Sequence, residues 1–177
     1  IQEDATRDGE LVTSPAVEAK RHVRSAGVDF TQGERLLEAG HVLDAARIAL
    51  AAAAGRASVS VARKPRVTVL SGGDELVALG REPAADQIYD SMSIGIAALA
   101  EQWGAAATAV GPLPDDAKTI ADALRNAVSQ SDLIVIVGGA SVGDHDYARP
   151  AVRTLGGALL FEKVALRPGK PTWFARI

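Results

Sequence analysis

The chain has 177 residues, of which 47% are hydrophobic and 23% charged, and its formal net charge is −3. It contains no cysteine, which excludes disulfides and thiolate metal sites, and only 4% of its residues are aromatic, too few for a nucleic-acid groove lined by stacking side chains. No apolar stretch is long enough to span a bilayer and no export signal is visible, so we expect a cytoplasmic protein that binds neither membrane nor nucleic acid. The chain opens on Ile1 without an initiator Met, which suggests a fragment or a processed chain.

Residues 1–65 are predicted to form a partial N-terminal region: the end of one domain and a linking helix. Residues 1–15 are polar, carry turn residues and show little periodicity. Residues 43–54 are rich in helix formers, with Asp44 near their start and Gly55 as a stop. This composition predicts one helix, Leu43 to Ala54.

A short half-buried strand is expected at Val59 and Val61, which alternate with polar neighbours, and Pro65 then marks a boundary. From residue 66 onward, apolar runs alternate with segments of helical character. The predicted strands are Val67–Leu70, Thr108–Val110, Leu133–Val137, Leu159–Ala165 and Thr172–Ala175; the predicted helices are Ser91 (as N-cap) to Trp103, Ala117–Ser129 and Ala148–Leu155.

This alternation predicts an α/β fold: a three-layer α/β/α sandwich with a mainly parallel sheet, occupying residues 66–177. The five apolar residues Leu133–Val137 are typical of a strand buried on both faces. Ligands of open α/β sheets bind at the carboxyl ends of the strands. The loops that follow the strands are therefore the candidate site.

Three such loops carry carboxylates: SGGDEL at 71–76, GPLPDD at 111–116, and the glycine-rich GGASVGDHD at 138–146. Glycines at a strand end let backbone N–H groups approach an anion closely. Carboxylates crowded on one rim would repel one another unless a divalent cation or protonation relieves them, and oxygen ligands suit Mg²⁺. The rim would hold Asp74, Glu75, Asp115, Asp116, Asp144 and Asp146. Helix capping alone is the competing explanation for Asp115 and Asp116.

A stiff basic turn follows at RPGKP, residues 167–171, where two prolines and a glycine hold Arg167 and Lys170 in positions suited to phosphate. Residues 71–146 carry a net charge of −9 and residues 147–177 a net charge of +5. Acidic loops beside a basic tail suit a phosphorylated ligand that also needs a metal. A plain β-turn with exposed charges is the competing explanation.

Residues 139–143, GASVG, also match the G-x-S-x-G elbow of serine hydrolases, with Ser141 as nucleophile. The triad order there is serine, acid, then histidine, and the only later histidine is His145, four residues on. His22 and His41 precede the serine. A hydrolase is therefore the weaker reading, and Ser141 is expected to contact an anion or cap a turn.

The ordered motifs SGGDEL, QIYDS, PDD, DLIVIVGGASVGDHDY and ALRPGKP resemble the molybdopterin molybdenumtransferase family, which includes MoeA and the gephyrin E domain. HVRSAGVDFTQGERLLEAGHVLD and the alanine-rich helix are similar to the segment that joins this family's second domain to its cofactor-binding domain. The resemblance thus extends from about Val17 to the end of the chain.

The resemblance implies an enzyme of molybdenum cofactor biosynthesis that inserts molybdate into adenylylated molybdopterin and releases AMP with Mg²⁺ present. It implies a homodimer and contact with the molybdopterin adenylyltransferase. The implied catalytic and metal-binding residues are Glu75, Asp116 and Asp146. The implied cofactor-binding residues are Gly73, Asp74, Asp90, Ser91, Gly138, Gly139, Ser141, Gly143, Asp144, Arg167, Pro168, Gly169, Lys170 and Pro171.

Three positions depart from the family's usual residues: Gly72 replaces Thr, Met92 replaces Asn, and Arg167 replaces Lys. The first two changes remove a hydroxyl and an amide from the expected site, and the third keeps the charge in a different geometry. An alternative therefore stays open: a diverged molybdopterin-binding or scaffolding module without transferase activity.

Overall fold

The computed structural model describes residues 2–138 and 146–177, and the chain divides into two units, residues 1–61 and 62–177. No helix in the described ranges combines the length and apolarity needed to cross a membrane.

In the smaller unit, the predicted helix is present as α1 (Ala45–Ala53). The Asp44 carboxylate accepts a hydrogen bond from the Arg47 backbone N–H at 2.9 Å, which satisfies one of the free donors of the first turn. Gly55, with φ of +74°, follows the helix end. The predicted helix is confirmed, although it begins two residues later and ends one residue earlier than the predicted range of Leu43 to Ala54.

Two other features of this unit differ from expectation. A short 3-10 helix η1 (Gln2–Asp4) precedes an antiparallel hairpin of β1 (Thr6–Asp8) and β2 (Leu11–Thr13). The Asp8-Gly9 pair is the turn signal in the sequence that indicates this hairpin. The strand predicted at Val59 and Val61 was wrong: both side chains are exposed and lie in irregular chain. Alternation of two valines forms no strand where no partner strand pairs with it.

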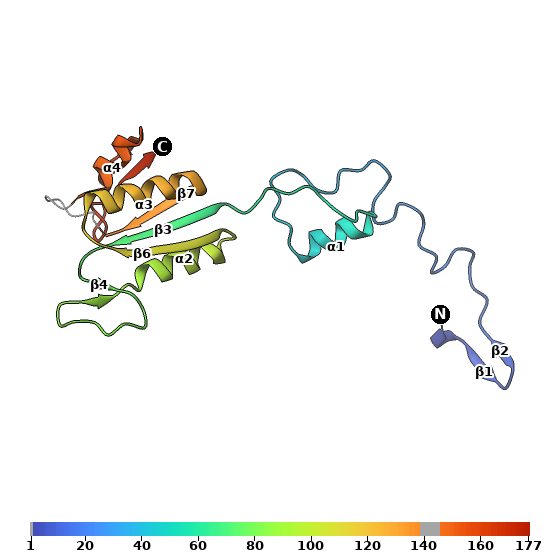
Figure 1. The fold of residues 1–177 in the computed structure, drawn as a ribbon. Coiled ribbons are helices and arrows are strands. Elements are labelled where there is room, and N and C mark those ends of the chain that lie inside the picture. The colour runs from blue at the N-terminus through green and yellow to red at the C-terminus, as the bar shows by residue number, and fades with distance from the viewer. Residues whose placement is uncertain (1, 139–145) are drawn as a thin grey trace. The chain divides into compact units, whose positions relative to one another are not determined.

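The larger unit contains seven strands and three helices within the described residues (Figure 1). In chain order they are β3 (Arg66–Gly72), β4 (Leu76–Val77), β5 (Ile88–Tyr89), α2 (Met92–Gln102), β6 (Ala106–Leu113), α3 (Ala117–Gln130), β7 (Leu133–Val137), α4 (Ala148–Thr154), β8 (Ala158–Phe161) and β9 (Phe174–Arg176).

The central sheet has the order β6-β3-β7, and both neighbours run parallel to β3. Figure 1 shows α2 on one face of these strands and α3 on the other, which confirms the predicted three-layer architecture. Side chains alternate between the layers, since Val67 and Val69 of β3 pack with α2 residues whereas Leu70 packs with α3.

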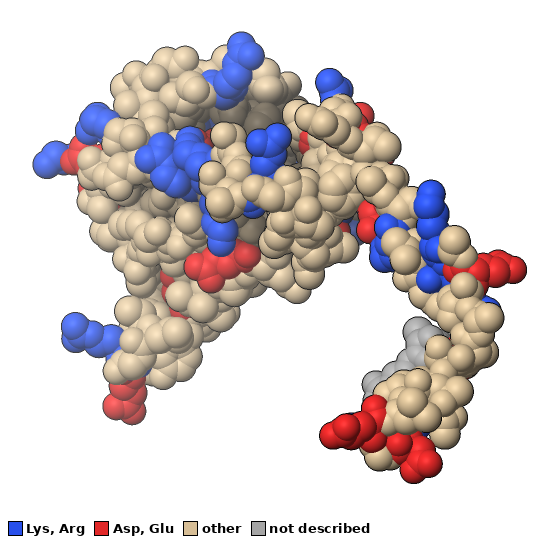
Figure 2. Space-filling view, turned by 90° about the vertical axis from the view of Figure 1, so that its right-hand side faces the viewer, with Lys and Arg blue, Asp and Glu red and all other residues tan. Residues whose placement is uncertain are grey.

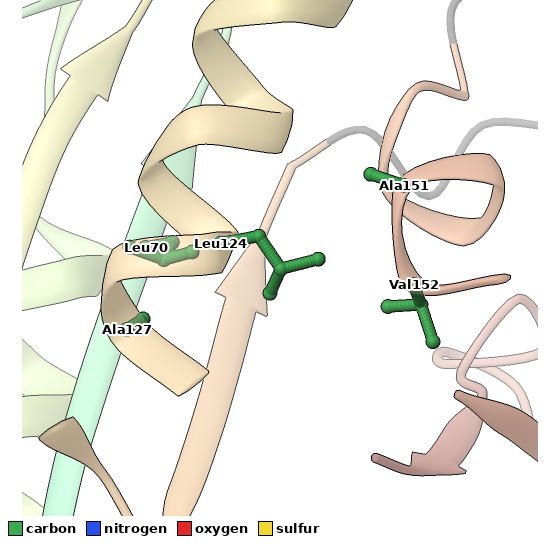
Figure 3. Packing of buried hydrophobic residues seen from close by; sticks show 5 residues of the cluster. All are labelled: Leu70, Leu124, Ala127, Ala151 and Val152. Carbon is green, nitrogen blue, oxygen red and sulfur yellow. The ribbon is translucent and has the colours of Figure 1, made fainter. Parts of the chain in front are cut away.

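The core beneath α3 contains five buried side chains from three elements: Leu70 on β3, Leu124 and Ala127 on α3, and Ala151 and Val152 on α4. Leu124 points from α3 toward the two α4 residues (Figure 3). Burying a side chain such as Leu or Val stabilises the fold by roughly 1.5–3 kcal/mol. This cluster fixes α4, and hence the chain just before it, against the sheet.

Several boundaries and burial states differ from the predictions. Leu133–Val137 forms β7 as predicted but is only half-buried, because β7 is an outer strand and β3 is the central one. The strand predicted at 108–110 extends over eight residues as β6, since it pairs with β3 along the length of that strand. The two C-terminal strands pair with each other as β8 and β9, antiparallel and separate from the central sheet.

The opposite, amino edge of the sheet is tied by Asp132. Its carboxylate accepts hydrogen bonds from the Arg63 guanidinium at 2.5 and 2.6 Å and from the Arg66 backbone N–H at 2.7 Å. The hydrogen bonds from Arg63, followed by the one from Arg66, hold the pKa of Asp132 well below its ordinary range. Asp132 thus fixes where β3 and β7 begin, at the end of the sheet away from the predicted site.

Candidate functional site at the carboxyl edge of the sheet

The three strands of the central sheet end side by side, and their backbones are in close contact there. The Gly73 N–H donates a hydrogen bond to the Leu113 carbonyl at 3.1 Å, which joins the ends of β3 and β6. A Cβ built on Gly138 would lie only 2.2 Å from the Gly72 carbonyl oxygen, so β7 leaves the sheet directly against β3. Glycine is required at 138 by this approach and by its φ of +89°.

A small hollow of about 20 Å³ opens at this edge, which is space for roughly one water molecule. The hollow is lined by Leu70, Ser71, Gly72, Leu113, Asp115, Ile120, Ile136, Val137, Gly138 and Ala148.

The loop after β3 places Asp74 and Glu75 at this edge. The Glu75 carboxylate lies over Gly73, since a Cβ there would be 2.5 Å from its Oε2. Asp74 Oδ1 accepts a hydrogen bond from the Asp115 backbone N–H at 3.1 Å. The structure therefore brings together the loops after β3 and β6, two of the three predicted loops. The Asp74 carboxylate binds the backbone of the loop after β6.

Asp116 caps α3. Its Oδ2 accepts hydrogen bonds from the Thr119 hydroxyl at 2.7 Å and the Thr119 N–H at 2.8 Å. These two bonds lower the pKa of Asp116 from its ordinary value. Capping, the competing explanation given for this residue, is what the carboxylate does in the structure.

Asp90 is buried, with 6% of its surface exposed, and joins β3 to α2. Its Oδ2 accepts hydrogen bonds from the Ser71 hydroxyl at 2.5 Å and the Ser93 hydroxyl at 2.7 Å, while Oδ1 accepts the Ser93 N–H at 3.3 Å. Burial raises the pKa of Asp90, but the hydrogen bonds from Ser71 and Ser93 outweigh it, and the pKa is lowered. Asp90 thus connects the end of β3, at the candidate site, to the first turn of α2.

Ser91 stands at the N-cap position of α2 as predicted, but its side chain makes no capping hydrogen bond. Asp90, one residue earlier, reaches the Ser93 N–H instead. The capping role predicted for Ser91 was therefore wrong, because the Ser91 backbone is already helical, with φ of −91° and ψ of −28°, and the Ser93 N–H is taken by Asp90.

We expect Asp90→Ala to destabilise the protein by about 2–4 kcal/mol, because it leaves the hydroxyls of two buried serines without their acceptor. Because folding lowers the pKa of Asp90, the charged carboxylate stabilises the folded protein at pH values above its ordinary pKa of 3.8. This stabilisation is lost as the pH falls through the lower, folded-state pKa. Denaturant unfolding of wild type and variant at pH 7 and at decreasing pH measures both effects. A difference between the two proteins that stays constant into the acid range would contradict the electrostatic part.

Asp146 lies two residues before α4 and is paired with Arg149. The Arg149 Nε lies 2.8 Å from Asp146 Oδ2, and the Arg149 backbone N–H donates to Oδ1 at 3.3 Å. Only 13% of the Arg149 side chain and 16% of the Asp146 side chain are exposed. This is the most buried of the ion pairs formed by the described residues.

Part of the predicted site falls outside the described residues: Gly139, Ser141, Gly143 and Asp144, together with His145. The segment Arg167–Pro171 forms a turn as predicted, closed by hydrogen bonds from Thr172 to the Gly169 carbonyl and from the Val164 N–H to the Lys170 carbonyl. Both of its basic side chains are exposed. Within the described part of the chain, no hydrogen bond or ion pair joins this turn to the loops after β3 and β6.

The predicted metal set of Glu75, Asp116 and Asp146 is not gathered into one cluster: the described residues contain no group of three His, Cys, Asp or Glu side chains able to hold a metal ion. Asp116 is engaged by Thr119 and Asp146 by Arg149.

In Figure 2, Lys and Arg side chains gather on part of the visible face with Asp and Glu side chains close beneath them, so the two signs are interspersed there.

The three departures noted in the sequence have distinct surroundings. A Cβ at Gly72 would meet only ordinary contacts, 3.7 Å from the Leu113 carbonyl oxygen, so the fold has room for a larger residue. Met92 begins α2 with 60% of its surface exposed. Arg167 lies in the exposed turn.

Sequence reasoning missed three polar residues of this region: Ser71, Ser93 and Arg149. Ser71 carried a signal, because it is a hydroxyl directly after a buried strand. Arg149 carried another, since it stands three residues after Asp146, the spacing at which a side chain returns to a helix cap.

The fold is a three-layer α/β domain with a parallel central sheet, and the candidate site is the carboxyl edge of that sheet, where ligands of open α/β sheets bind. Residues 68–177 match the family described as "Probable molybdopterin binding domain", and residues 1–55 match the "MoeA N-terminal region (domain I and II)". The chain belongs to the molybdopterin molybdenumtransferase family, of the MoeA type.

Curated relatives bear the name molybdopterin molybdenumtransferase. One from Nostoc sp. is 38% identical over 149 residues, which is 84% of this chain and 34% of the relative. One from Haemophilus influenzae is 34% identical over 179 residues, which is 100% of this chain and 44% of the relative. A solved structure of a molybdopterin biosynthesis MoeA protein from Pyrococcus horikoshii has a TM-score of 0.78 at 31% identity, covering 99% of this chain and 44% of that one. The chain spans less than half the length of these relatives.

Proposed function

We propose that the full-length protein inserts molybdate into adenylylated molybdopterin and releases AMP. The family membership supports this, as do the names of the relatives. The observation that carries the proposal is the placement of acidic groups near the strand ends: Glu75 lies over the backbone of Gly73, and Asp146 is nearly buried two residues before Ala148, which lines the hollow at this edge.

In this proposal Glu75, Asp116 and Asp146 are the catalytic residues, and the glycine loop and the basic turn bind the pterin and its phosphates. The ligand-contacting set is Gly73, Asp74, Asp90, Ser91, Gly138, Gly139, Ser141, Gly143, Asp144, Arg167, Pro168, Gly169, Lys170 and Pro171. The surroundings of Asp90 favour a supporting role over direct contact, because its carboxylate is buried and occupied by two serines.

Mg²⁺ is proposed as the metal, with Glu75, Asp116 and Asp146 as ligands. It would neutralise phosphate charge at the rim. The described residues form no three-acid cluster, so these three carboxylates do not make a ready-formed metal site in this structure. Its requirement is tested by leaving it out of the assay.

The remaining proposals concern the wider protein. We infer a cytoplasmic homodimer that contacts the molybdopterin adenylyltransferase, with residues 1–65 as the end of an N-terminal domain and residues 66–177 as the molybdopterin-binding domain. The division of the chain at residues 61 and 62 supports a boundary in this region.

A second function stays open: a molybdopterin-binding or scaffolding module without transferase activity. Two observations favour it. Gly72 provides no hydroxyl at the end of β3, and Met92 presents an exposed thioether at the start of α2 where the family usually has an amide.

The two functions are separated by titrating the full-length protein calorimetrically with adenylylated molybdopterin, and measuring released AMP, with and without molybdate and Mg²⁺. The transferase predicts binding in all cases and AMP release only when molybdate and Mg²⁺ are both present. Binding without release supports the module. Absence of binding would overturn both and direct attention to Gly72 and Met92.

A further inference from the structure

The pair Asp146–Arg149 repeats a unit found elsewhere in the chain. In α1, Asp44 accepts the Arg47 backbone N–H and its Oδ2 forms an ion pair with the Arg47 guanidinium. Asp146 accepts the Arg149 backbone N–H and forms the same pair through Oδ2. In both, an aspartate is bound by the arginine three residues later; Asp44 is the N-cap residue of α1, whereas Asp146 lies two residues before α4.

The two pairs differ in burial and place. In the α1 pair, 39% of the Arg47 side chain and 52% of the Asp44 side chain are exposed, as suits a solvent-facing cap. In the second pair the exposed fractions are 13% for Arg149 and 16% for Asp146, and Ala148, which stands between the two residues in the chain, lines the hollow at the carboxyl edge. Ion pairs in water contribute little, whereas removal of one partner of a buried pair leaves an uncompensated charge. Capping a helix does not require burial, because the α1 pair caps its helix while exposed to solvent.

The Arg149 Nε–H also lacks a well-aligned acceptor among the described residues, although Oδ2 is 2.8 Å away. The guanidinium is thus held beside the carboxylate by charge more than by a linear hydrogen bond. Buried donors without aligned acceptors are uncommon in folded proteins, and each calls for an explanation. Here the two contacts from one residue, to Oδ1 and to Oδ2, restrain rotation of the Asp146 carboxylate.

We propose that Arg149 is the positioning residue of Asp146: its buried guanidinium fixes the orientation of this carboxylate and balances its charge at the carboxyl edge of the sheet. The inference rests on the proposed function, in which Asp146 is catalytic. Arg149 itself makes no contact with substrate in this scheme and acts through Asp146.

The test compares Arg149→Gln, Arg149→Lys and the matched control Arg47→Gln in the full-length protein, by AMP release with saturating molybdate and Mg²⁺. Loss of a residue that orients a reacting group typically costs 10- to 100-fold, so we expect kcat of Arg149→Gln to fall by about that factor. KM for adenylylated molybdopterin should stay within about twofold, because uniform substrate binding is untouched. Arg149→Lys, which keeps the charge, should recover most of the loss, and Arg47→Gln should match wild type.

A second readout works on the protein without substrate: carbodiimide-driven amidation of Asp146, measured by tandem mass spectrometry. Arg149→Gln should increase the labelling of Asp146, whereas Arg47→Gln should increase only that of Asp44. Two results would overturn this inference and leave the proposed function standing: a kcat of Arg149→Gln equal to that of wild type, or the same loss of kcat in Arg47→Gln. A wild-type protein that releases no AMP would overturn the proposed function, and unchanged labelling of Asp146 would then overturn this inference as well.

Discussion

Replacing Asp146 with Asn in the full-length protein is expected to reduce AMP release by at least about 100-fold, the lower range for a group that takes part in proton or charge transfer. The amide keeps the shape of the carboxylate but removes its charge. Binding of adenylylated molybdopterin should stay within about threefold, because the loss falls on the reacting state rather than on ground-state binding. Turnover and calorimetric affinity measured on the same protein separate these effects.

The control for this variant is Asp122→Asn. Asp122 pairs with Arg125 at the same three-residue spacing, but both side chains are more than half exposed on α3, away from the strand ends. Its turnover should equal that of wild type. Because Asp146→Asn also leaves Arg149 without its charged partner, thermal unfolding is recorded for both variants. A folded Asp146→Asn protein with unchanged turnover would remove Asp146 from the mechanism.

Gly138→Ala is expected to destabilise the protein by about 2–5 kcal/mol. A left-handed backbone costs a residue with a side chain about 1–2 kcal/mol, and displacing a neighbour from a packed position costs about 1–3 kcal/mol more. Both terms apply at 138, where φ is +89° and the new Cβ would lie 2.2 Å from the Gly72 carbonyl oxygen. Denaturant unfolding at neutral pH measures the loss.

Gly80→Ala isolates the backbone term. Gly80 has a similar φ of +82°, but no atom lies within 4 Å of the position a Cβ would take. It should therefore show only about 1–2 kcal/mol of destabilisation. Equal losses in the two variants would mean that β3 and β7 separate without cost at this edge, which contradicts the close contact of their ends.

The sequence determined the elements whose signals are local. The apolar run 133–137 and the valines of 67–70 identified the two strands, and Asp44 with Gly55 delimited α1. The order and spacing of five short motifs identified the family as well, and the family models confirm it. Predictions that depend on pairing with another strand were less successful. Val59 and Val61 alternate with polar residues but form no strand, and β6 is longer than its apolar residues indicated because β3 pairs along it.

For the candidate site, the chain alone predicted that acidic residues of the loops after β3 and β6 lie at the carboxyl edge of the sheet, because strand ends and loop composition are local features. The contacts of each carboxylate could not be predicted in this way. Asp116 is occupied by Thr119, Asp74 by the Asp115 backbone, and Asp90 by two buried serines. The physical reason is that a carboxylate binds whichever donors the fold brings within about 3 Å, and that distance is set by packing between segments far apart in the chain.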